Sequence, residues 1–153
     1  MDLILWRHAE AELLREGSTD AERALTAKGE RQATRMAQWL NHRLAATTRV
    51  LVSPAERSRA TAAALGRDSR ITPSIAPEAT VDDLLKASRW PRASEPVLLV
   101  GHQPGLGKLA SLLLTGEPLD WTIKKGAVWW LRSRQRDGVD EVILQAVQAP
   151  DSL

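Results

Sequence analysis

Four residues of the chain, two histidines and two arginines, have the chemistry to bind and transfer a phosphoryl group. They are Arg7, His8, Arg57 and His102. Arg7, His8 and His102 stand at the ends of short apolar runs, and Arg57 lies on the first turn of the helix predicted after another such run. A guanidinium holds phosphate oxygens through paired N–H donors, and a neutral imidazole is a nucleophile when one nitrogen is free. Their combination predicts a pocket for a dianion such as a phosphoryl group.

Short strands and helices must position these residues. Four apolar runs predict strands at Leu3–Trp6, Arg49–Val52, Ile71–Ile75 and Pro96–Val100. Helical patterns between them predict helices that start at Thr26, Ser53, Thr80 and Gln103-Pro104. This alternation predicts a parallel sheet with helices on both faces, and ligands bind such sheets beyond the carboxyl ends of the strands. We therefore expect both histidines and both arginines at that edge.

The helix predicted after Ser53 carries an electrostatic conflict. Ser53, Pro54 and Glu56 form the sequence of a capping box, with Ser53 as the N-cap residue. Arg57 then places a cation near the positive end of the helix dipole, at a cost of about 0.3–1 kcal/mol. An anion bound between Arg57 and the helix N-termini would remove this conflict. The alternative is an ordinary surface arginine.

The last third of the sequence is rich in β-forming residues. Gly126–Leu131 and Glu141–Val147 are predicted strands, and Asp137-Gly138 between them predicts a hairpin. The adjacent pair Trp129-Trp130 must face opposite sides of the sheet. The expected fold class is α/β, a three-layer α/β/α sandwich whose mostly parallel central sheet has an antiparallel edge. We expect one domain over residues 1–153.

Composition excludes several classes of protein. The 153 residues include no Cys, which excludes disulfides, cysteine-ligated zinc, iron–sulfur clusters and a cysteine nucleophile. The net charge is +2 with no run of five like charges, so we expect no nucleic-acid partner. No apolar stretch approaches the ~18 residues of a membrane span, and the N-terminus lacks the basic start of a signal peptide. We therefore expect a cytoplasmic protein with no membrane partner.

The order of these motifs resembles the histidine phosphatase superfamily, which has a phosphoglycerate-mutase-like fold. The likeness is greatest to the small SixA-type protein phosphohistidine phosphatases, and it extends from residue 2 to about residue 131. It is carried by Leu3-Ile4-Leu5-Trp6-Arg7-His8-Ala9-Glu10-Ala11, Asp20-x-x-Arg23-x-Leu25-Thr26-x-x-Gly29, Leu51-Val52-Ser53-Pro54-x-x-Arg57-x-x-x-Thr61-Ala62 and Leu98-Leu99-Val100-Gly101-His102-Gln103-Pro104. The chain departs from many members at Ala9, where they have Gly.

The resemblance implies a role for each of the four residues. His8 matches the nucleophile that becomes phosphorylated, and His102 matches the second histidine, which contacts the phosphoryl group in the transition state. Arg7 and Arg57 match the arginines that hold the phosphoryl oxygens. Two guanidiniums neutralise that charge without a metal, so we expect no metal and no cofactor. Metal-dependent hydrolysis is the alternative, and it predicts sensitivity to EDTA.

The sequence offers three candidates for the general acid and does not select one of them. Superfamily members that act on esters use a Glu or Asp to protonate the leaving oxygen, and Glu78 is the first candidate here, before Asp82 and Asp83. The two aspartates also suit the N-terminus of the helix that starts at Thr80. His42 lies near the end of the first long helix, where a solvent-exposed residue without a catalytic role is expected.

The leaving group and the chain length bear on the substrate. Imidazole, with a pKa of ~6.5, leaves more readily than an alkoxide and does not require a strong acid. The segment from Ile75 to Pro96 leaves little room for a lid. We therefore expect hydrolysis of phosphohistidine on a protein, such as a phosphotransfer or histidine-kinase type domain, through phospho-His8. The alternatives are a small-molecule phosphomonoesterase of the same fold and a phosphate-binding interaction module without turnover. A mutase would need a longer, enclosed site.

Overall fold

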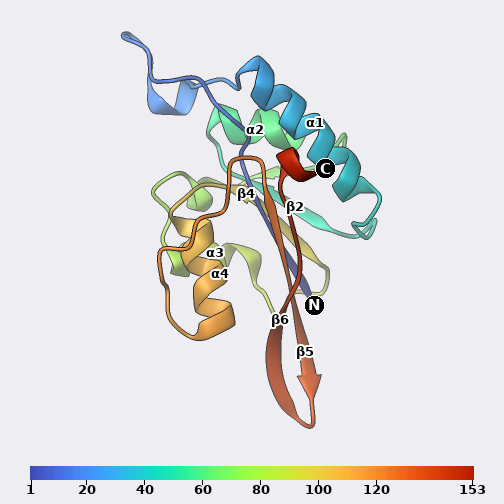
Figure 1. The fold of residues 1–153 in the computed structure, drawn as a ribbon. Helices are drawn as coiled ribbons and strands as arrows, with labels where there is room; N and C mark the ends of the chain where they lie inside the picture. The colour runs from blue at the N-terminus through green and yellow to red at the C-terminus, as the bar shows by residue number, and fades with distance from the viewer.

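A six-stranded sheet forms the centre of the molecule in the computed structural model, which describes all 153 residues (Figure 1). Its strands are β1 (Asp2–Arg7), β2 (Arg49–Val52), β3 (Arg70–Ile71), β4 (Val97–Gly101), β5 (Val128–Arg136) and β6 (Val139–Gln148). Their order is β3-β2-β4-β1-β5-β6. The first four are parallel, whereas β5 and β6 are antiparallel at one edge. The predicted mostly parallel sheet with an antiparallel edge is confirmed.

Helices cover both faces of this sheet. The helices α1 (Ala27–Asn41) and α2 (Glu56–Ala63) lie on one face, and α3 (Val81–Ser88) and α4 (Gly105–Thr115) lie on the other (Figure 1). Alternate residues of β1 face the two sides, so Ile4 packs towards α1 while Leu5 packs towards α4. The three-layer α/β/α sandwich is therefore confirmed. None of these helices combines the length and apolar character that crossing a membrane requires.

Two of the predicted helix starts are confirmed by their capping hydrogen bonds. The Thr26 hydroxyl accepts the N–H of Gly29 at 2.9 Å. The Thr80 hydroxyl accepts the N–H of Asp83, whose carboxylate accepts the Thr80 N–H in return. Each threonine thus satisfies a backbone donor that the first helical turn leaves without a partner.

The predicted capping box at Ser53 is wrong. The residue before α2 is Ala55, which makes no side-chain cap, and its N–H donates to the Ser53 hydroxyl at 3.2 Å. The Ser53 hydroxyl also lies 2.7 Å from Nε2 of His102. The serine therefore contacts His102 across the edge of the sheet and bonds the residue before α2, but it does not cap the helix itself.

The predicted third strand is too long. Only Arg70 and Ile71 pair with β2, and Thr72 makes one more backbone hydrogen bond, to Val52. Pro73 has no N–H for the ladder, and a short 3₁₀ helix, η2 (Pro73–Ile75), follows instead. Ile75 is buried in the core on the α3–α4 side of the sheet.

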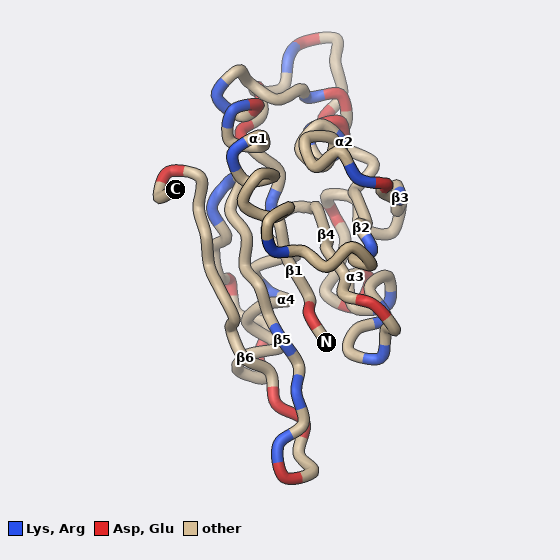
Figure 2. Tube along the Cα trace, turned by 90° about the vertical axis from the view of Figure 1, so that its right-hand side faces the viewer, with Lys and Arg blue, Asp and Glu red and all other residues tan.

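The predicted hairpin is confirmed, and its strands are longer than expected. Asp137 and Gly138 both have positive φ angles, 52° and 78°, which is the two-residue turn that matches strand twist. Beyond Ser133, which bonds to Met1, the two strands pair only with each other, and this part projects from the body (Figure 1). Basic residues lie on its β5 strand and acidic residues in its turn and on β6, and Arg134 pairs with Glu141 across the two strands (Figure 2). The pair Trp129-Trp130 faces opposite sides of the sheet, as predicted.

Candidate active site

His8 and His102 lie side by side because they follow the ends of two adjacent parallel strands. Arg7 of β1 is in register with Gly101 of β4, and the backbone N–H of His8 donates to the Gly101 carbonyl at 3.0 Å. The centroids of the two imidazole rings are 5.1 Å apart. Both side chains are buried. The structure thus brings the two histidines together at the edge where the sequence predicted them.

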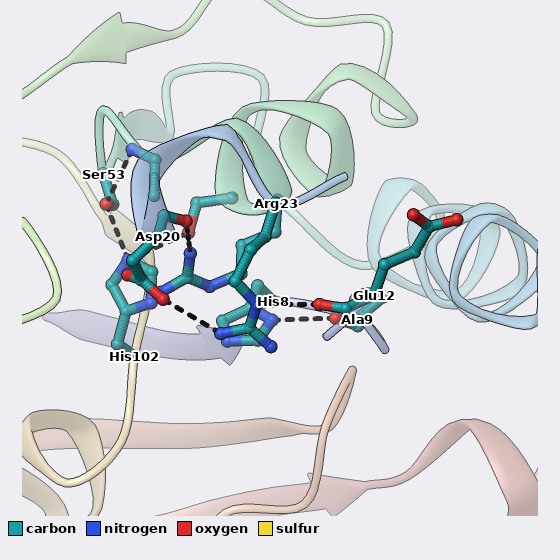
Figure 3. Close-up of polar contacts among 10 residues, drawn as sticks. His8, Ala9, Glu12, Asp20, Arg23, Ser53 and His102 are labelled. Atoms are coloured by element: carbon teal, nitrogen blue, oxygen red, sulfur yellow. Dashed lines mark hydrogen bonds and ion pairs between the residues drawn. The ribbon is translucent and has the colours of Figure 1, made fainter. Parts of the chain in front are cut away.

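The ring of His8 has one nitrogen free for attack. Its Nδ1 donates to the carbonyl oxygen of Ala9 at 2.7 Å, which fixes the proton on Nδ1 and leaves the lone pair on Nε2 (Figure 3). Burial lowers the pKa of His8 to about 4, and the charges of Arg57 and Arg7 act in the same direction. The neutral imidazole that a nucleophile requires is therefore the form present at neutral pH.

The ring of His102 is held by two buried serines. Its Nε2 lies 2.7 Å from the Ser53 hydroxyl and 3.2 Å from the Ser58 hydroxyl. Each hydroxyl carries a proton that needs an acceptor, so the balance of donors and acceptors favours Nε2 as the acceptor and Nδ1 as the protonated nitrogen. Burial, followed by the charge of His8, lowers the pKa of His102 to about 3. A neutral ring thus offers an Nδ1–H donor.

The two arginines are fixed through their terminal nitrogens. Nη1 of Arg7 donates to the carbonyl of Ile123 at 2.8 Å. Nη1 of Arg57 donates to the carbonyl of Asp20 at 2.8 Å, and its Nη2 donates to the Asp20 carboxylate at 3.1 Å. Nε of each arginine and Nδ1 of His102 are buried with no hydrogen-bond partner. The site therefore holds three buried, uncommitted donors on three side chains.

Asp20 and Arg23 belong to this site, although sequence reasoning gave neither of them a role. The Asp20 carboxylate joins Arg57 to Arg23, whose Nη1 donates to it at 3.1 Å (Figure 3). Nε of Arg23 also donates to the Glu12 carbonyl at 2.7 Å. Hydrogen bonds from Arg23 and Arg57 lower the pKa of Asp20, so its carboxylate stays charged. The spacing Asp20-x-x-Arg23 was the available signal, but the sequence does not show that its partner is Arg57.

Comparison with known proteins settles the family. The model of the histidine phosphatase superfamily (branch 1) matches residues 3–86, more than half of the chain. The chain belongs to this superfamily. An uncharacterized protein from Picosynechococcus sp. is 34% identical to it over 143 residues, which cover 87% of this chain and 86% of that protein.

Solved structures extend the comparison to the whole fold of this histidine phosphatase. A protein assigned as the phosphohistidine phosphatase SixA of Nakamurella multipartitia aligns with a TM-score of 0.81 and 28% identity, over 97% of this chain and 95% of that one. The protein histidine phosphatase SixA complexed with tungstate aligns with a TM-score of 0.78 and 25% identity, over 99% of both chains. A protein assigned as an alpha-ribazole-5′-P phosphatase of Escherichia coli shares the fold with a TM-score of 0.71 and 20% identity, over 98% of both chains. These findings support a phosphatase.

Segments outside the four residues connect the site of this histidine phosphatase to its helices. The N–H of Ala9 donates to the Thr61 hydroxyl at 3.0 Å, and that hydroxyl donates to the Arg57 carbonyl at 2.7 Å. A Cβ atom added at Gly29 would lie 2.0 Å from the Glu10 carbonyl oxygen. The chain that follows His8 is therefore packed closely against both α1 and α2.

None of the remaining candidates from the sequence forms a hydrogen bond with either of the two histidines. Glu78 is exposed, forms no hydrogen bond or salt bridge, and lines a surface cavity with Pro104 and Gly105 at the start of α4. Asp82 is exposed, while the Asp83 carboxylate is used in the Thr80 cap. His42 is exposed at the end of α1, with Nδ1 bonded to its own helix. No group of three His, Cys, Asp or Glu side chains is placed to hold a metal ion.

Proposed function

We propose that this chain is a phosphohistidine phosphatase that hydrolyses N-phosphohistidine on a protein through phospho-His8, without a metal. One observation carries the proposal: Nε of Arg7, Nε of Arg57 and Nδ1 of His102 are buried, uncommitted donors. They belong to the residues that adjoin His8 in the sequence, act on it by their charge, or place a ring centroid 5.1 Å from its own. Three fixed donors around a nucleophile suit a phosphoryl group, whose transition state spreads charge over three equatorial oxygens.

The first step transfers the phosphoryl group to His8. Nε2 of His8 forms a bond to phosphorus while the bond from phosphorus to the substrate imidazole breaks. A substrate ring that carries a proton on its second nitrogen leaves as neutral imidazole, so this step needs no proton from the protein. Arg7, Arg57 and His102 compensate the charge on the phosphoryl oxygens.

The second step transfers the phosphoryl group to water. The water oxygen forms a bond to phosphorus as the bond to Nε2 of His8 breaks, and inorganic phosphate is released. The carbonyl of Ala9 holds the Nδ1 proton throughout, since it accepts that hydrogen bond at 2.7 Å. His8 therefore also leaves as a neutral imidazole.

A protein substrate is supported by the surroundings of the site. The segment between η2 and β4 contains only α3 and its connections, and α3 packs against α4 rather than over the histidines. Of the SixA structures with which this chain aligns, one is named a phosphohistidine phosphatase and another a protein histidine phosphatase. A phosphotransfer or histidine-kinase type domain is the partner that this proposal implies, and Glu78 is a general acid only for ester substrates.

The test compares phosphate release from a phosphohistidine protein and from p-nitrophenyl phosphate. We expect turnover of the phosphohistidine protein to continue in EDTA and in Glu78→Gln, and to be lost in His8→Ala. His42→Ala is the matched control, because it removes an exposed histidine outside the site. Mass spectrometry of the acid-labile intermediate should place the phosphoryl group on His8.

Each competing hypothesis has its own outcome. Full turnover by His8→Ala would overturn the mechanism, and loss of turnover in EDTA would indicate metal-dependent hydrolysis. Rapid hydrolysis of p-nitrophenyl phosphate that depends on Glu78, with no action on phosphohistidine, would indicate a small-molecule phosphomonoesterase. Phosphate binding without turnover of either substrate would indicate an interaction module.

A further inference from the structure

A second cationic cavity lies along β2 and β3, at the edge of the sheet opposite to β6. It has a volume of about 420 Å³ and is lined by Arg49, the first residue of β2, by Arg70, the first residue of β3, and by Arg89, which follows α3. None of the residues that line it belongs to the candidate active site. Strands rise about 3.3 Å per residue, so Arg49 itself lies about 13 Å along the strand from Ser53. We propose that this cavity is a second anion site, separate from the active site, which binds a small organic phosphate.

The charge of the three arginines is not neutralised within the chain. None of them takes part in a salt bridge, and no acidic residue lines the cavity. Nη1 of Arg49 is buried and has no hydrogen-bond partner. Figure 2 shows basic segments around β2 and β3 and in the loop after α3. The three positive charges repel one another, whereas a bound anion attracts each of them and offsets that repulsion.

Arg89 adopts a backbone conformation that its residue type disfavours. Its φ and ψ angles are 54° and 14°, in the left-handed region where helices usually end on Gly or Asn. An arginine here brings a third guanidinium to the wall of the cavity at the expense of backbone strain. Strain of this kind, retained beside a charged cavity, is typical of a binding site.

The rest of the cavity wall determines the class of ligand. Leu51 and Ile71 line it beside the arginines, and Ile71 is 51% exposed. The volume lies in the range of sites that bind small molecules. Guanidiniums next to an apolar wall suit a ligand with a multiply charged phosphate group and an organic part, so a phosphate ester fits better than free phosphate.

The first experiment measures binding with the active site disabled. In the Arg57→Ala variant, isothermal titration calorimetry at about 0.15 M salt should show saturable one-to-one binding of ADP, because partly buried charges are less screened than exposed ones. Inorganic pyrophosphate, the probe without an organic part, should bind more weakly than ADP. Absence of saturable binding by both probes would overturn the proposal, and tighter binding of pyrophosphate would overturn the choice of an organic ligand.

The second experiment locates the binding site with a matched pair of variants. Arg89→Asn and Arg92→Asn each remove one positive charge from the same loop, but only Arg89 lines the cavity. Asn tolerates the left-handed conformation, so Arg89→Asn should fold normally. We expect Arg89→Asn and Arg70→Gln to weaken ADP binding by about tenfold or more and Arg92→Asn by less than twofold. Equal losses in Arg89→Asn and Arg92→Asn would contradict a site in this cavity.

Phosphatase activity separates this proposal from the proposed function. With p-nitrophenyl phosphate, Arg89→Asn should turn over within twofold of the wild-type rate, because Arg89 does not contact the two histidines. ADP binding by the Arg57→Ala variant, together with no turnover of phosphohistidine or p-nitrophenyl phosphate by the wild-type chain, would support the anion site and refute the phosphatase.

Discussion

His8 and His102 are neutral at neutral pH because burial lowers the pKa of both, to about 4 and about 3. The same burial disfavours the protonated, charged form of each ring. Ala9 determines which nitrogen of His8 is free, whereas Ser53 and Ser58 together determine this for His102. At the scale of single residues, the candidate chemistry therefore depends on hydrogen bonds to groups that do not themselves react.

Stability should fall as the pH falls from 7 to 5. The unfolded chain binds protons at histidine with a pKa of ~6.5, above the folded values of about 4 and about 3. The unfolded state therefore binds more protons between pH 6.5 and 4, and the free energy of unfolding decreases through that window. We expect a loss of about 4 kcal/mol between pH 7 and 5 by urea denaturation, about 2 kcal/mol from each histidine.

A histidine variant provides the control for this pH dependence. His102→Gln removes one of the two buried groups that resist protonation, so its stability should change about half as much over the same interval. Equal stability of the wild-type protein at pH 7 and 5 would show that the two rings are not held neutral by folding.

Removal of both serine hydroxyls should impair His102 without unfolding the protein. Either hydroxyl can donate to Nε2, so we expect Ser53→Ala and Ser58→Ala each to lose little activity. The double variant should lose about tenfold in kcat/KM, less than the hundredfold or more expected for loss of an oxyanion donor itself. Nitrogen NMR of His102 should show mixed tautomers only in the double variant; a single tautomer there would contradict this role.

At the scale of elements, the site depends on close approach between the chain after His8 and the start of α1. We expect Gly29→Ala to destabilise the fold by about 1–3 kcal/mol, because its Cβ would lie 2.0 Å from the Glu10 carbonyl oxygen. Activity should fall as well, since Glu10 is two residues from His8.

A second glycine tests whether that effect is specific to the contact with Glu10. At Gly101 an added Cβ would meet only the Leu106 side chain, at 3.8 Å, which is ordinary van der Waals contact. Gly101→Ala should therefore change the melting temperature less than Gly29→Ala. A similar loss in both variants would argue against the close approach as the cause.

Local sequence patterns predicted the elements well wherever neighbouring residues determine them. The caps at Thr26 and Thr80 and the turn at Asp137-Gly138 use partners within a few residues. The pattern at Ser53 failed because the competing partner, His102, is 49 residues away. Tertiary contacts of that range leave no local signal in one sequence.

The same distinction separates the site residues that the sequence predicted from those that it did not. The strand ends placed His8 and His102 together because adjacent parallel strands share an edge. Asp20 and Arg23 were overlooked, since a loop residue gains its role only when the loop reaches α2, where Asp20 contacts Arg57. The anion cavity was also not predicted, because its arginines come from three separate elements.

At the scale of the whole molecule, the outer part of the β5–β6 hairpin should be dispensable. Residues 134–141 pair only with one another, beyond the last residue of β5 that contacts β1. Replacing them with Asn-Gly would connect the paired residues Ser133 and Val142 by a two-residue turn. We expect unchanged activity and a melting temperature within a few degrees of the wild type. Loss of activity would reveal a role for the projecting tip.

The central position of β1 affects how the chain can be made in a cell. β1 is synthesised first, but its neighbours in the sheet, β4 and β5, begin at Val97 and Val128. A nascent chain that ends near residue 86 already contains His8 and Arg57, yet it lacks β4, the strand that separates β1 from β2. Its apolar first strand stays unpaired on the ribosome until late in translation, so we expect premature termination products to aggregate or be degraded rather than to retain partial activity.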